Sequence, residues 1–172
     1  MKRTGKAAAF VAAAVTALSG AFITPASAAT SYVSDVCTSS NNTYCFQLNW
    51  GSRGETTWVG LDACFVSNQD VPDYYGYSPN GATLVRYVFR HGELNDAGTG
   101  LAGLCRGEGG GEAVKNNAAS GANAECSATH RVYFNSGYGG ISQAFLPDCG
   151  THWPSQNLVS SLKNENASAD RY

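Results

Sequence analysis

Six cysteines are the residues of this chain whose chemistry is easiest to assign; they lie at positions 37, 45, 64, 105, 126 and 149. Zinc-binding cysteines usually come in close pairs, but here successive cysteines are separated by 7, 18, 40, 20 and 22 residues. An even number of widely spaced cysteines instead predicts disulfide bonds, which form in exported proteins. Number and spacing by themselves leave the pairing open, because six cysteines can be joined in many ways.

The histidines and carboxylates do not form a recognisable catalytic motif. The chain's three histidines are His91, His130 and His152. None belongs to an H-E-x-x-H pattern, and no serine or cysteine nucleophile lies in a known motif. Glu93, Asp96 and Glu108 could supply paired carboxylates for glycoside hydrolysis, but carboxylates on a glycine-rich segment are usually solvated. We therefore predict no catalytic residues and no enzyme; a hydrolase is the alternative and would need a cleft with converging polar groups.

Residues 1–28 have the pattern of a secretory signal peptide. Three basic residues precede an apolar run at 7–23, and 25–28 ends in the small-x-small pattern that signal peptidase accepts. A membrane anchor is the alternative, but the apolar run is shorter than a bilayer span and no comparable run follows. We expect cleavage after Ala28, and a secreted, extracellular mature chain of residues 29–172 that does not associate with a membrane.

The charge of the mature chain excludes two classes of partner. Removing the signal leaves 8 Lys and Arg of the original 11 against all 13 Asp and Glu, a formal charge of −5. Nucleic-acid binding requires a basic face, and docking to anionic lipids requires the same. Gly, Asn, Ser, Thr and aromatic residues are abundant, while the Lys, Glu and Leu of long helices are scarce. The composition predicts a single all-β domain, with few or no helices, which we expect to be monomeric.

Short apolar segments between turn residues give the expected strands. They cover residues 43–50, 56–60, 63–67, 82–89, 112–116 and 131–135. Residues 29–42 are polar and are expected to form a surface arm held by Cys37. Residues 68–81 contain three tyrosines and two prolines, which predicts an ordered loop with aromatic anchors, since disordered segments lack such residues. Residues 90–111 form a glycine-rich loop.

Two blocks of sequence recur in the same order. Phe46–Gly54 aligns with Val132–Gly140 through N-x-G-x-x-G at an offset of 86, and Lys115–Ser120 aligns with Lys163–Ser168 through K-N-x-x-A-S at an offset of 48. The first copy therefore carries 86 − 48 = 38 extra residues, between Gly54 and Val114. Chance similarity among glycine- and asparagine-rich turns is the alternative. We interpret the blocks as a duplicated strand–turn–strand unit whose two copies pack together.

The duplication sets the expected domain boundaries and favours one disulfide pairing. The first motif spans about residues 43–120 with an insertion, and the second about 130–170. Sequential pairing keeps each bridge within one part of the repeat. The favoured pairs are Cys37–Cys45, Cys64–Cys105 and Cys126–Cys149.

Residues 131–140 form an aromatic strand ending in a Tyr-x-Gly turn, and residues 157–162 place serines before a return strand; both resemble the Greek-key motif of βγ-crystallins. The order of signal peptide, Cys37 and Cys45, aromatic strand, N-x-G-x-x-G and K-N-x-x-A-S resembles a narrower group. That group is the small secreted bacterial proteins of the metalloproteinase-inhibitor family, which are crystallin-like in fold. The resemblance covers most of the mature chain but not residues 68–111. It implies a βγ-crystallin-like Greek-key sandwich of two motifs, and inhibition of an extracellular metalloprotease.

The resemblance supplies no reactive-loop residue by position. Residues 68–81 are a candidate exposed loop in which Tyr74, Tyr75 and Tyr77 could anchor a protease, because interfaces favour tyrosine. Alternatively, the same tyrosines cover the core. A second candidate function is a secreted structural or toxin-like crystallin domain with no protease target.

Residues 156–161 resemble the crystallin calcium motif in part. The motif begins with two Asn or Asp residues and ends with Ser/Thr-Ser; here Asn157, Ser160 and Ser161 are present but Gln156 replaces the first position. Calcium affinity follows ligand charge, and the matching block at 108–113 of the first copy has no serine. We therefore expect no metal and no cofactor. Ser160 is expected instead to hydrogen-bond a neighbouring turn.

Overall fold

The computed structural model describes residues 28–38, 44–56, 60–94, 103–152 and 154–172. Within these ranges the protein is all-β and contains no α-helix, as the composition predicted. The strands are β1 Ala29–Val33, β2 Asp35–Val36, β3 Phe46–Asn49, β4 Cys64–Ser67, β5 Thr83–Tyr87, β6 Gly92–Leu94, β7 Gly103–Cys105, β8 Ser120–Asn123, β9 His130–Asn135, β10 Gly139–Phe145, β11 Gln156–Asn157 and β12 Ser168–Arg171. The predicted signal peptide lies outside the described residues.

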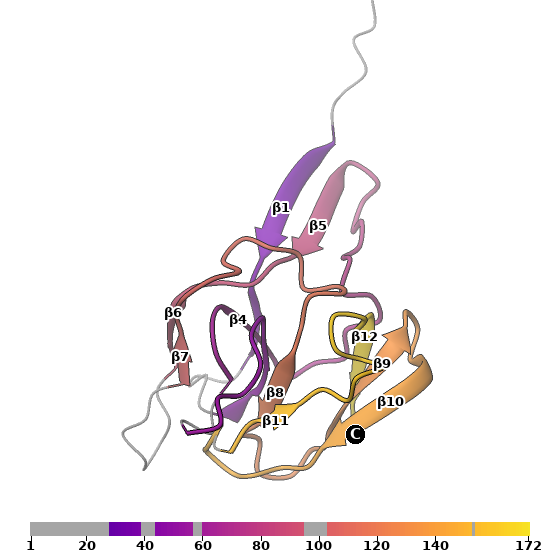
Figure 1. Ribbon diagram of the computed structural model, residues 1–172. Helices are drawn as coiled ribbons and strands as arrows, with labels where there is room; N and C mark the ends of the chain where they lie inside the picture. Colours follow the sequence, from indigo (N-terminus) through magenta and orange to yellow (C-terminus); the bar gives the residue numbers. More distant parts are fainter. Residues whose placement is uncertain (1–27, 39–43, 57–59, 95–102, 153) are drawn as a thin grey trace, which may run out of the picture.

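Two larger sheets form the body of the molecule (Figure 1). One has the strand order β11-β8-β3-β4-β2 and the other the order β10-β9-β12. β11 comes from the C-terminal half of the chain but pairs with β8 in the sheet of the N-terminal half. In return, Val71 of the N-terminal half forms a bridge with Ala169 of β12. Each half thus completes the sheet of the other.

A single large hydrophobic core joins the two sheets. Phe46 and Leu48 of β3 pack in one buried cluster with Val132 of β9 and Phe145 of β10. The ring of Phe46 stacks on His130 with centroids 4.6 Å apart. Since the residues come from both halves of the chain, neither half buries its apolar face alone.

The strand register changes one of the two sequence alignments. Asn49 pairs with Ser120, and Tyr133 pairs with Ser168, so the first strands of the two copies are related by 133 − 49 = 84 residues and not by 86. The fully buried Leu48 and Val132 become equivalent at this offset, because a strand's register is set by the face it buries. The N-x-G-x-x-G match is therefore shifted by two residues from the structural correspondence.

The K-N-x-x-A-S match, in contrast, is a structural correspondence. Asn116 and Asn164 both adopt left-handed conformations, with φ of 62° and 59°. Ser120 Oγ donates to Gly51 O at 2.7 Å, and Ser168 Oγ donates to Asn135 O at 2.7 Å. Each serine thus ties the last strand of its half to the end of the first strand.

Two local expectations are wrong. Residues 112–116, expected as a strand, form turns in which only Ala113 makes a bridge. Residues 157–162 begin in β11 and continue as turns, and the return strand that follows them is β12. Ser160 is exposed, and the bonds to the turns come from Ser120 and Ser168. Turn-forming residues at 114–117 and 160–165 override the weak strand pattern. The expected strand at 56–60 lies largely outside the described residues.

The cysteines form three disulfides in the sequential pairs. Cys37–Cys45, Cys64–Cys105 and Cys126–Cys149 have Cα–Cα distances of 6.1, 5.0 and 3.9 Å. No described cysteine is free. Three disulfides in a chain of this size are typical of proteins from oxidising compartments.

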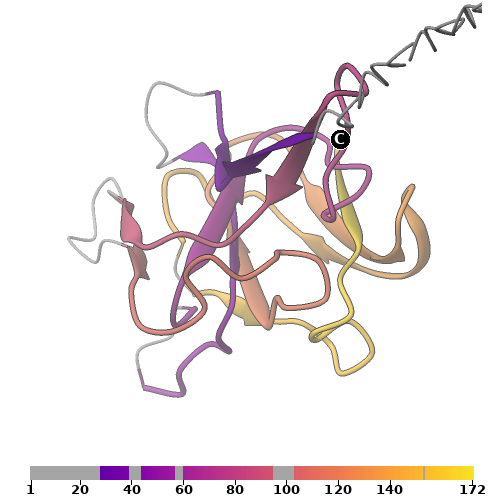
Figure 2. The same cartoon turned by 90° about the horizontal axis from the view of Figure 1, so that it is seen from above.

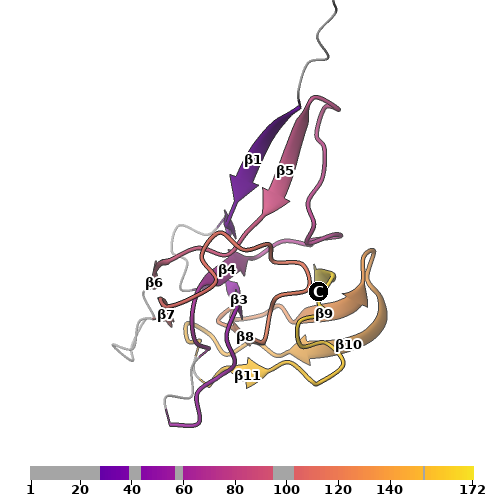
Figure 3. The same ribbon diagram turned by 45° about the horizontal axis from the view of Figure 1, so that its top comes forward.

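One part of the chain projects from the body. β1 and β5 pair in parallel as a separate two-stranded sheet, and Figures 1 and 3 show this pair extending away from the two larger sheets. Figure 2 looks down on it from above. We call residues 29–33 and 75–87 the arm.

Candidate binding surface

The base of the segment 68–81 is part of the core. Val71 exchanges backbone hydrogen bonds with Ala169 at 2.7 and 3.0 Å. Tyr74 is fully buried, and its ring meets the edge of Phe65 with centroids 5.8 Å apart. Beyond Tyr74 the chain leaves the body, and residues 77–82 are exposed. The segment is therefore a loop with a buried root and an exposed end.

Asp73 and Gly76 shape the point at which the chain leaves the body. Asp73 Oδ1 accepts hydrogen bonds from Tyr75 N at 2.8 Å and from Lys115 Nζ at 2.9 Å. Burial raises the pKa of Asp73, but these bonds outweigh burial and hold the pKa below its ordinary value. Gly76 has a φ of 115°, and a Cβ there would lie 1.8 Å from Val85 O. Only glycine allows the chain to pass β5 this closely.

The tip of the loop is fixed by its own side chains. Ser78 Oγ donates to Thr83 O at 2.8 Å. Asn80 Oδ1 accepts from Ala82 N at 2.9 Å and from Thr83 N at 2.8 Å. Tyr77 and Val85 exchange both backbone hydrogen bonds below the tip. Because short polar side chains replace the backbone partners that a turn lacks, the exposed end of the loop is internally hydrogen-bonded.

The structure divides the three candidate tyrosines. Tyr74 belongs to the core, whereas Tyr75 and Tyr77 are each 54% exposed. The interpretation that the tyrosines cover the core is thus confirmed for Tyr74, while Tyr75 and Tyr77 stay candidates for contact with a partner. Since adjacent residues of the loop face opposite ways, the sequence could not tell which tyrosine points inward.

β1 forms the second edge of the arm. Its residues 29–32 are exposed, which agrees with the expected surface arm, although they form a strand and not an irregular segment. Val33 packs against the core, and the Cys37–Cys45 disulfide fixes the chain below it. All five residues of β1 pair with β5, and Ala29 N also donates to Ala82 O at 3.1 Å. The pairing therefore reaches the tip of the loop.

The other residues considered for chemistry do not form a site. Asn157 Oδ1 accepts from Arg53 N at 2.6 Å, which ties β11 to the turn after β3. In the described parts of the chain no three His, Cys, Asp or Glu side chains are grouped to hold a metal. His91 and Glu108 are exposed, while Asp96 and the side chain of Glu93 lie outside the described part.

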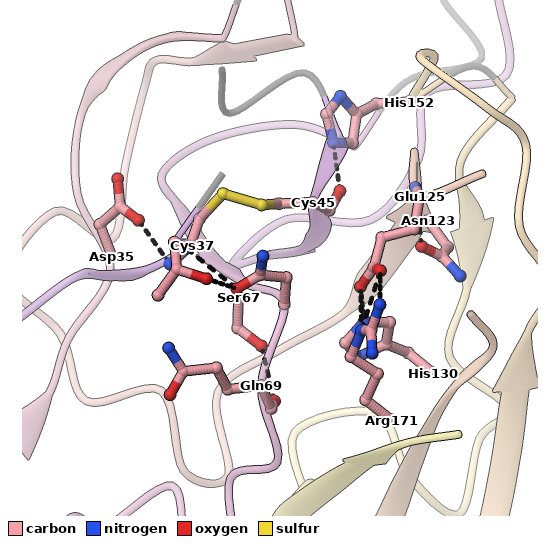
Figure 4. The surroundings of a disulfide bond; sticks show 12 residues. Asp35, Cys37, Cys45, Ser67, Gln69, Asn123, Glu125, His130, His152 and Arg171 are labelled. Atoms are coloured by element: carbon pink, nitrogen blue, oxygen red, sulfur yellow. Dashed lines mark hydrogen bonds and ion pairs between the residues drawn. A yellow bond between two sulfur atoms is a disulfide. The ribbon is translucent and has the colours of Figure 1, made fainter. Parts of the chain in front are cut away.

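A partly buried cluster of Glu125, His130 and Arg171 was not predicted. Arg171 makes a bidentate contact with Glu125, and His130 Nε2 lies 2.5 Å from Glu125 Oε1 (Figure 4). His130 is fully buried and Glu125 is 5% exposed. Burial lowers the pKa of His130, and the contact with Glu125 opposes this only in part. Four residues, one of them Cys126, lie between Glu125 and His130, and they form no local motif that predicts the cluster.

His152 has a structural role as well. It is 1% exposed, and its Nε2 lies 2.9 Å from the carbonyl of Cys45 (Figure 4). The ring thus connects the loop after β10 to the residue that precedes β3. A histidine whose ring is enclosed in this way cannot reach a substrate.

No family model, curated protein or solved structure matches this chain. Among the described residues no helix is long and apolar enough to cross a membrane.

Proposed function

We propose that the protein is a secreted inhibitor of an extracellular metalloprotease, and that the arm is the part that enters or covers the protease cleft. The observation that carries this proposal is the exposed segment 75–82, which is hydrogen-bonded at its tip and anchored by the buried Tyr74 at its root.

The physical advantage of such a segment is its order before binding. A flexible loop loses conformational freedom when a protease holds it, and each immobilised side chain lowers affinity. In the arm this loss has already occurred on folding, because Ser78 and Asn80 fix the tip and Gly76 fixes the base. Tyrosine side chains on a rigid loop then supply contact area at low entropic cost.

The body supports the resemblance from which the inhibitor function was inferred. In our proposal the two halves are crystallin-like Greek-key motifs. The exchange of β11 and Val71 between the sheets and the matching serine-to-turn bonds of Ser120 and Ser168 are what two such motifs related by a pseudo-twofold axis would produce.

The alternative is a secreted structural or toxin-like crystallin domain with no protease target. It is favoured by the fact that the repeated residues Asn116, Ser120, Asn164 and Ser168 all serve the fold. Under this alternative the arm would bind another protein, or none, and protease activity would be unaffected at any concentration.

Titration of the chain beginning at Ala29 against a panel of thermolysin-type metalloproteases tests the proposal, with serine proteases of subtilisin type as a specificity control. We expect stoichiometric loss of peptide hydrolysis for at least one metalloprotease. The double variant Tyr75→Ala/Tyr77→Ala should weaken inhibition by about tenfold or more, whereas Ile141→Ala, at a residue equally exposed on β10, should not. If peptide hydrolysis by every metalloprotease of the panel is unaltered at a large molar excess of the protein, the proposal is wrong.

A further inference from the structure

The outward face of the arm carries an arginine between two tyrosines. Val85 and Tyr87 are each only 8% exposed, so the alternating residues Leu84 and Arg86 of β5 face away from the body. Tyr32 is the direct partner of Arg86 in the parallel β1–β5 pair, and partners in adjacent strands share a face. Tyr32 is 70% exposed.

Tyr75 completes the row from the other side. The Arg86 guanidinium carbon lies 3.9 Å from the centre of the Tyr75 ring, which is a close cation–π contact. Such a contact fixes the direction of the half-buried guanidinium, whose Nη1 also donates a long hydrogen bond to Val85 O at 3.4 Å. We name Tyr32, Arg86 and Tyr75 the Tyr–Arg–Tyr row. Tyrosine and arginine are the side chains most enriched at the energetic centres of interfaces.

The electrostatics of the arm differ from those of the rest of the chain. The mature chain has a formal charge of −5, yet residues 29–34 and 74–92 contain no Asp or Glu. Two of the carboxylates that flank these segments in the sequence are paired: Asp73 with Lys115 at 2.9 Å, and Asp35 with Arg90 at 3.2 Å. Arg86 forms no ion pair with any described residue. It is therefore a cation whose charge is available to a partner.

We propose that the Tyr–Arg–Tyr row recognises an acidic protein surface, with Arg86 bound to a carboxylate and the two tyrosines packed around the contact. This inference rests on the proposed inhibitor function and defines its partner: a protease with carboxylates beside its cleft. An acidic partner approaching an acidic inhibitor is repelled by most of the inhibitor's surface, but on the arm it meets an unopposed positive charge. Electrostatic complementarity of this kind selects the docking face and raises the association rate.

A polyanion such as an acidic glycan fits the row less well. Polyanions are held by several cations arranged along their length, whereas the outward face of the arm offers one unpaired arginine. A single arginine between tyrosine rings matches one carboxylate at a defined position, because a guanidinium binds a carboxylate through two parallel hydrogen bonds.

The test uses the thermolysin-type protease that the wild-type protein inhibits, and compares Arg86→Glu with Lys163→Glu. Both variants change the net charge equally, but the exposed Lys163 lies outside the arm. We expect Arg86→Glu to raise the inhibition constant by at least about 30-fold and Lys163→Glu by less than about twofold. The wild-type association rate should fall as salt is raised, and that of Arg86→Glu should not. Arg86→Lys should lie between them, since it keeps the charge but loses the bidentate geometry.

Melting temperatures establish that the variants are folded. If Arg86→Glu does not fold, Tyr32→Ala replaces it, because Tyr32 is largely exposed; we expect about fivefold to tenfold weaker inhibition. If the wild type inhibits the protease and Arg86→Glu or Tyr32→Ala inhibits it equally well, the proposed role of the row is wrong and the inhibitor function stands. Absence of wild-type inhibition would overturn both. A third outcome is that heparin retains the wild type but not Arg86→Glu, while the two proteins have the same inhibition constant. The partner of the row would then be an anionic glycan and not a protein.

Discussion

Asn80 at the tip of the arm and Asn166 between the two halves of the body have the same side chain and different roles. Asn80 accepts two hydrogen bonds from backbone groups two and three residues away, in full contact with water. Asn166 is fully buried and bridges 48 to 52 residues: its Oδ1 accepts from Ala118 N, and its Nδ2 donates to Val114 O, both at 2.9 Å. The tip of the arm is thus held by local, solvated bonds, whereas the two halves of the body are joined by distant, buried ones.

The difference separates binding from stability. A buried polar group that loses its partner cannot turn to water, whereas an exposed one can. Changes within the body should therefore unfold the protein, and changes at the end of the arm should alter its surface while the fold persists. Four predictions test this division, from the largest expected effect to the smallest.

Tyr74→Ala should be the most damaging change, because Tyr74 joins the arm to the core. Removing a buried aromatic ring costs about 3–5 kcal/mol of unfolding free energy. Tyr77→Ala, at a half-exposed ring three residues later, should cost less than about 1 kcal/mol. Urea unfolding followed by tryptophan fluorescence measures the unfolding free energy of both variants. Equal losses of unfolding free energy would contradict the division between a buried body and an exposed arm.

Tyr74→Phe sharpens the same test. The buried hydroxyl has no hydrogen-bond partner among the described residues, and burial raises its pKa. Removing it should leave stability unchanged or improve it, because no bond is lost. A marked loss on Tyr74→Phe would show that the hydroxyl is bonded in solution.

Asn166→Ala should cost about 2–4 kcal/mol, because it leaves the amide of Ala118 and the carbonyl of Val114 buried without partners. Asn80→Ala should cost less than about 1 kcal/mol, since water can replace its two bonds. Thermal unfolding of the two variants measures the contrast directly. If both lowered the melting temperature alike, burial would not be the deciding factor.

Gly76→Ala should disturb the arm and spare the body. The substitution places a Cβ against Val85 O at a φ of 115°, a conformation that costs about 1–3 kcal/mol in a residue with a side chain. Gly81→Ala is the matched control, because Gly81 also has a positive φ, of 72°, but open space around it. Hydrogen exchange should show faster exchange of Tyr77 and Val85 amides in Gly76→Ala alone, with the amides of β9 protected in both variants.

The smallest effect should be a gradual loss of stability on acidification. Burial lowers the pKa of His130 below that of the unfolded chain, so below about pH 6.5 the unfolded state binds a proton that the folded state resists. Unfolding free energy therefore falls as the pH drops below this range. His130→Gln should show a shallower decrease between about pH 7.5 and pH 5.5. If the unfolding free energy fell equally with pH in the wild type and in His130→Gln, His130 would not be the cause of the decrease.

The sequence predicted the features that depend on neighbouring residues. The all-β class follows from composition. The K-N-x-x-A-S repeat was visible in the sequence, but the left-handed turns that it forms at Asn116 and Asn164 were not, since residues 112–116 were predicted as a strand. The sequential disulfides agree with the preferred pairing because each bridge closes a segment of 8, 41 or 23 residues within one part of the repeat.

Features that depend on distant partners were missed or only partly predicted. The N-x-G-x-x-G alignment was wrong by two residues because the register follows the buried Leu48 and Val132. The parallel pairing of β1 with β5 joins residues more than fifty positions apart. No periodicity in either segment specifies such a partner.

What the sequence determined by itself is the K-N-x-x-A-S repeat, the disulfide-bonded all-β class and the location of the added segment in the first half of the chain. Only the tertiary structure decided that Tyr74 points into the core while Tyr75 stacks on Arg86, and that β1 brings Tyr32 beside them. The physical reason is range: backbone preferences act over a few residues, whereas burial and strand pairing depend on the whole folded chain.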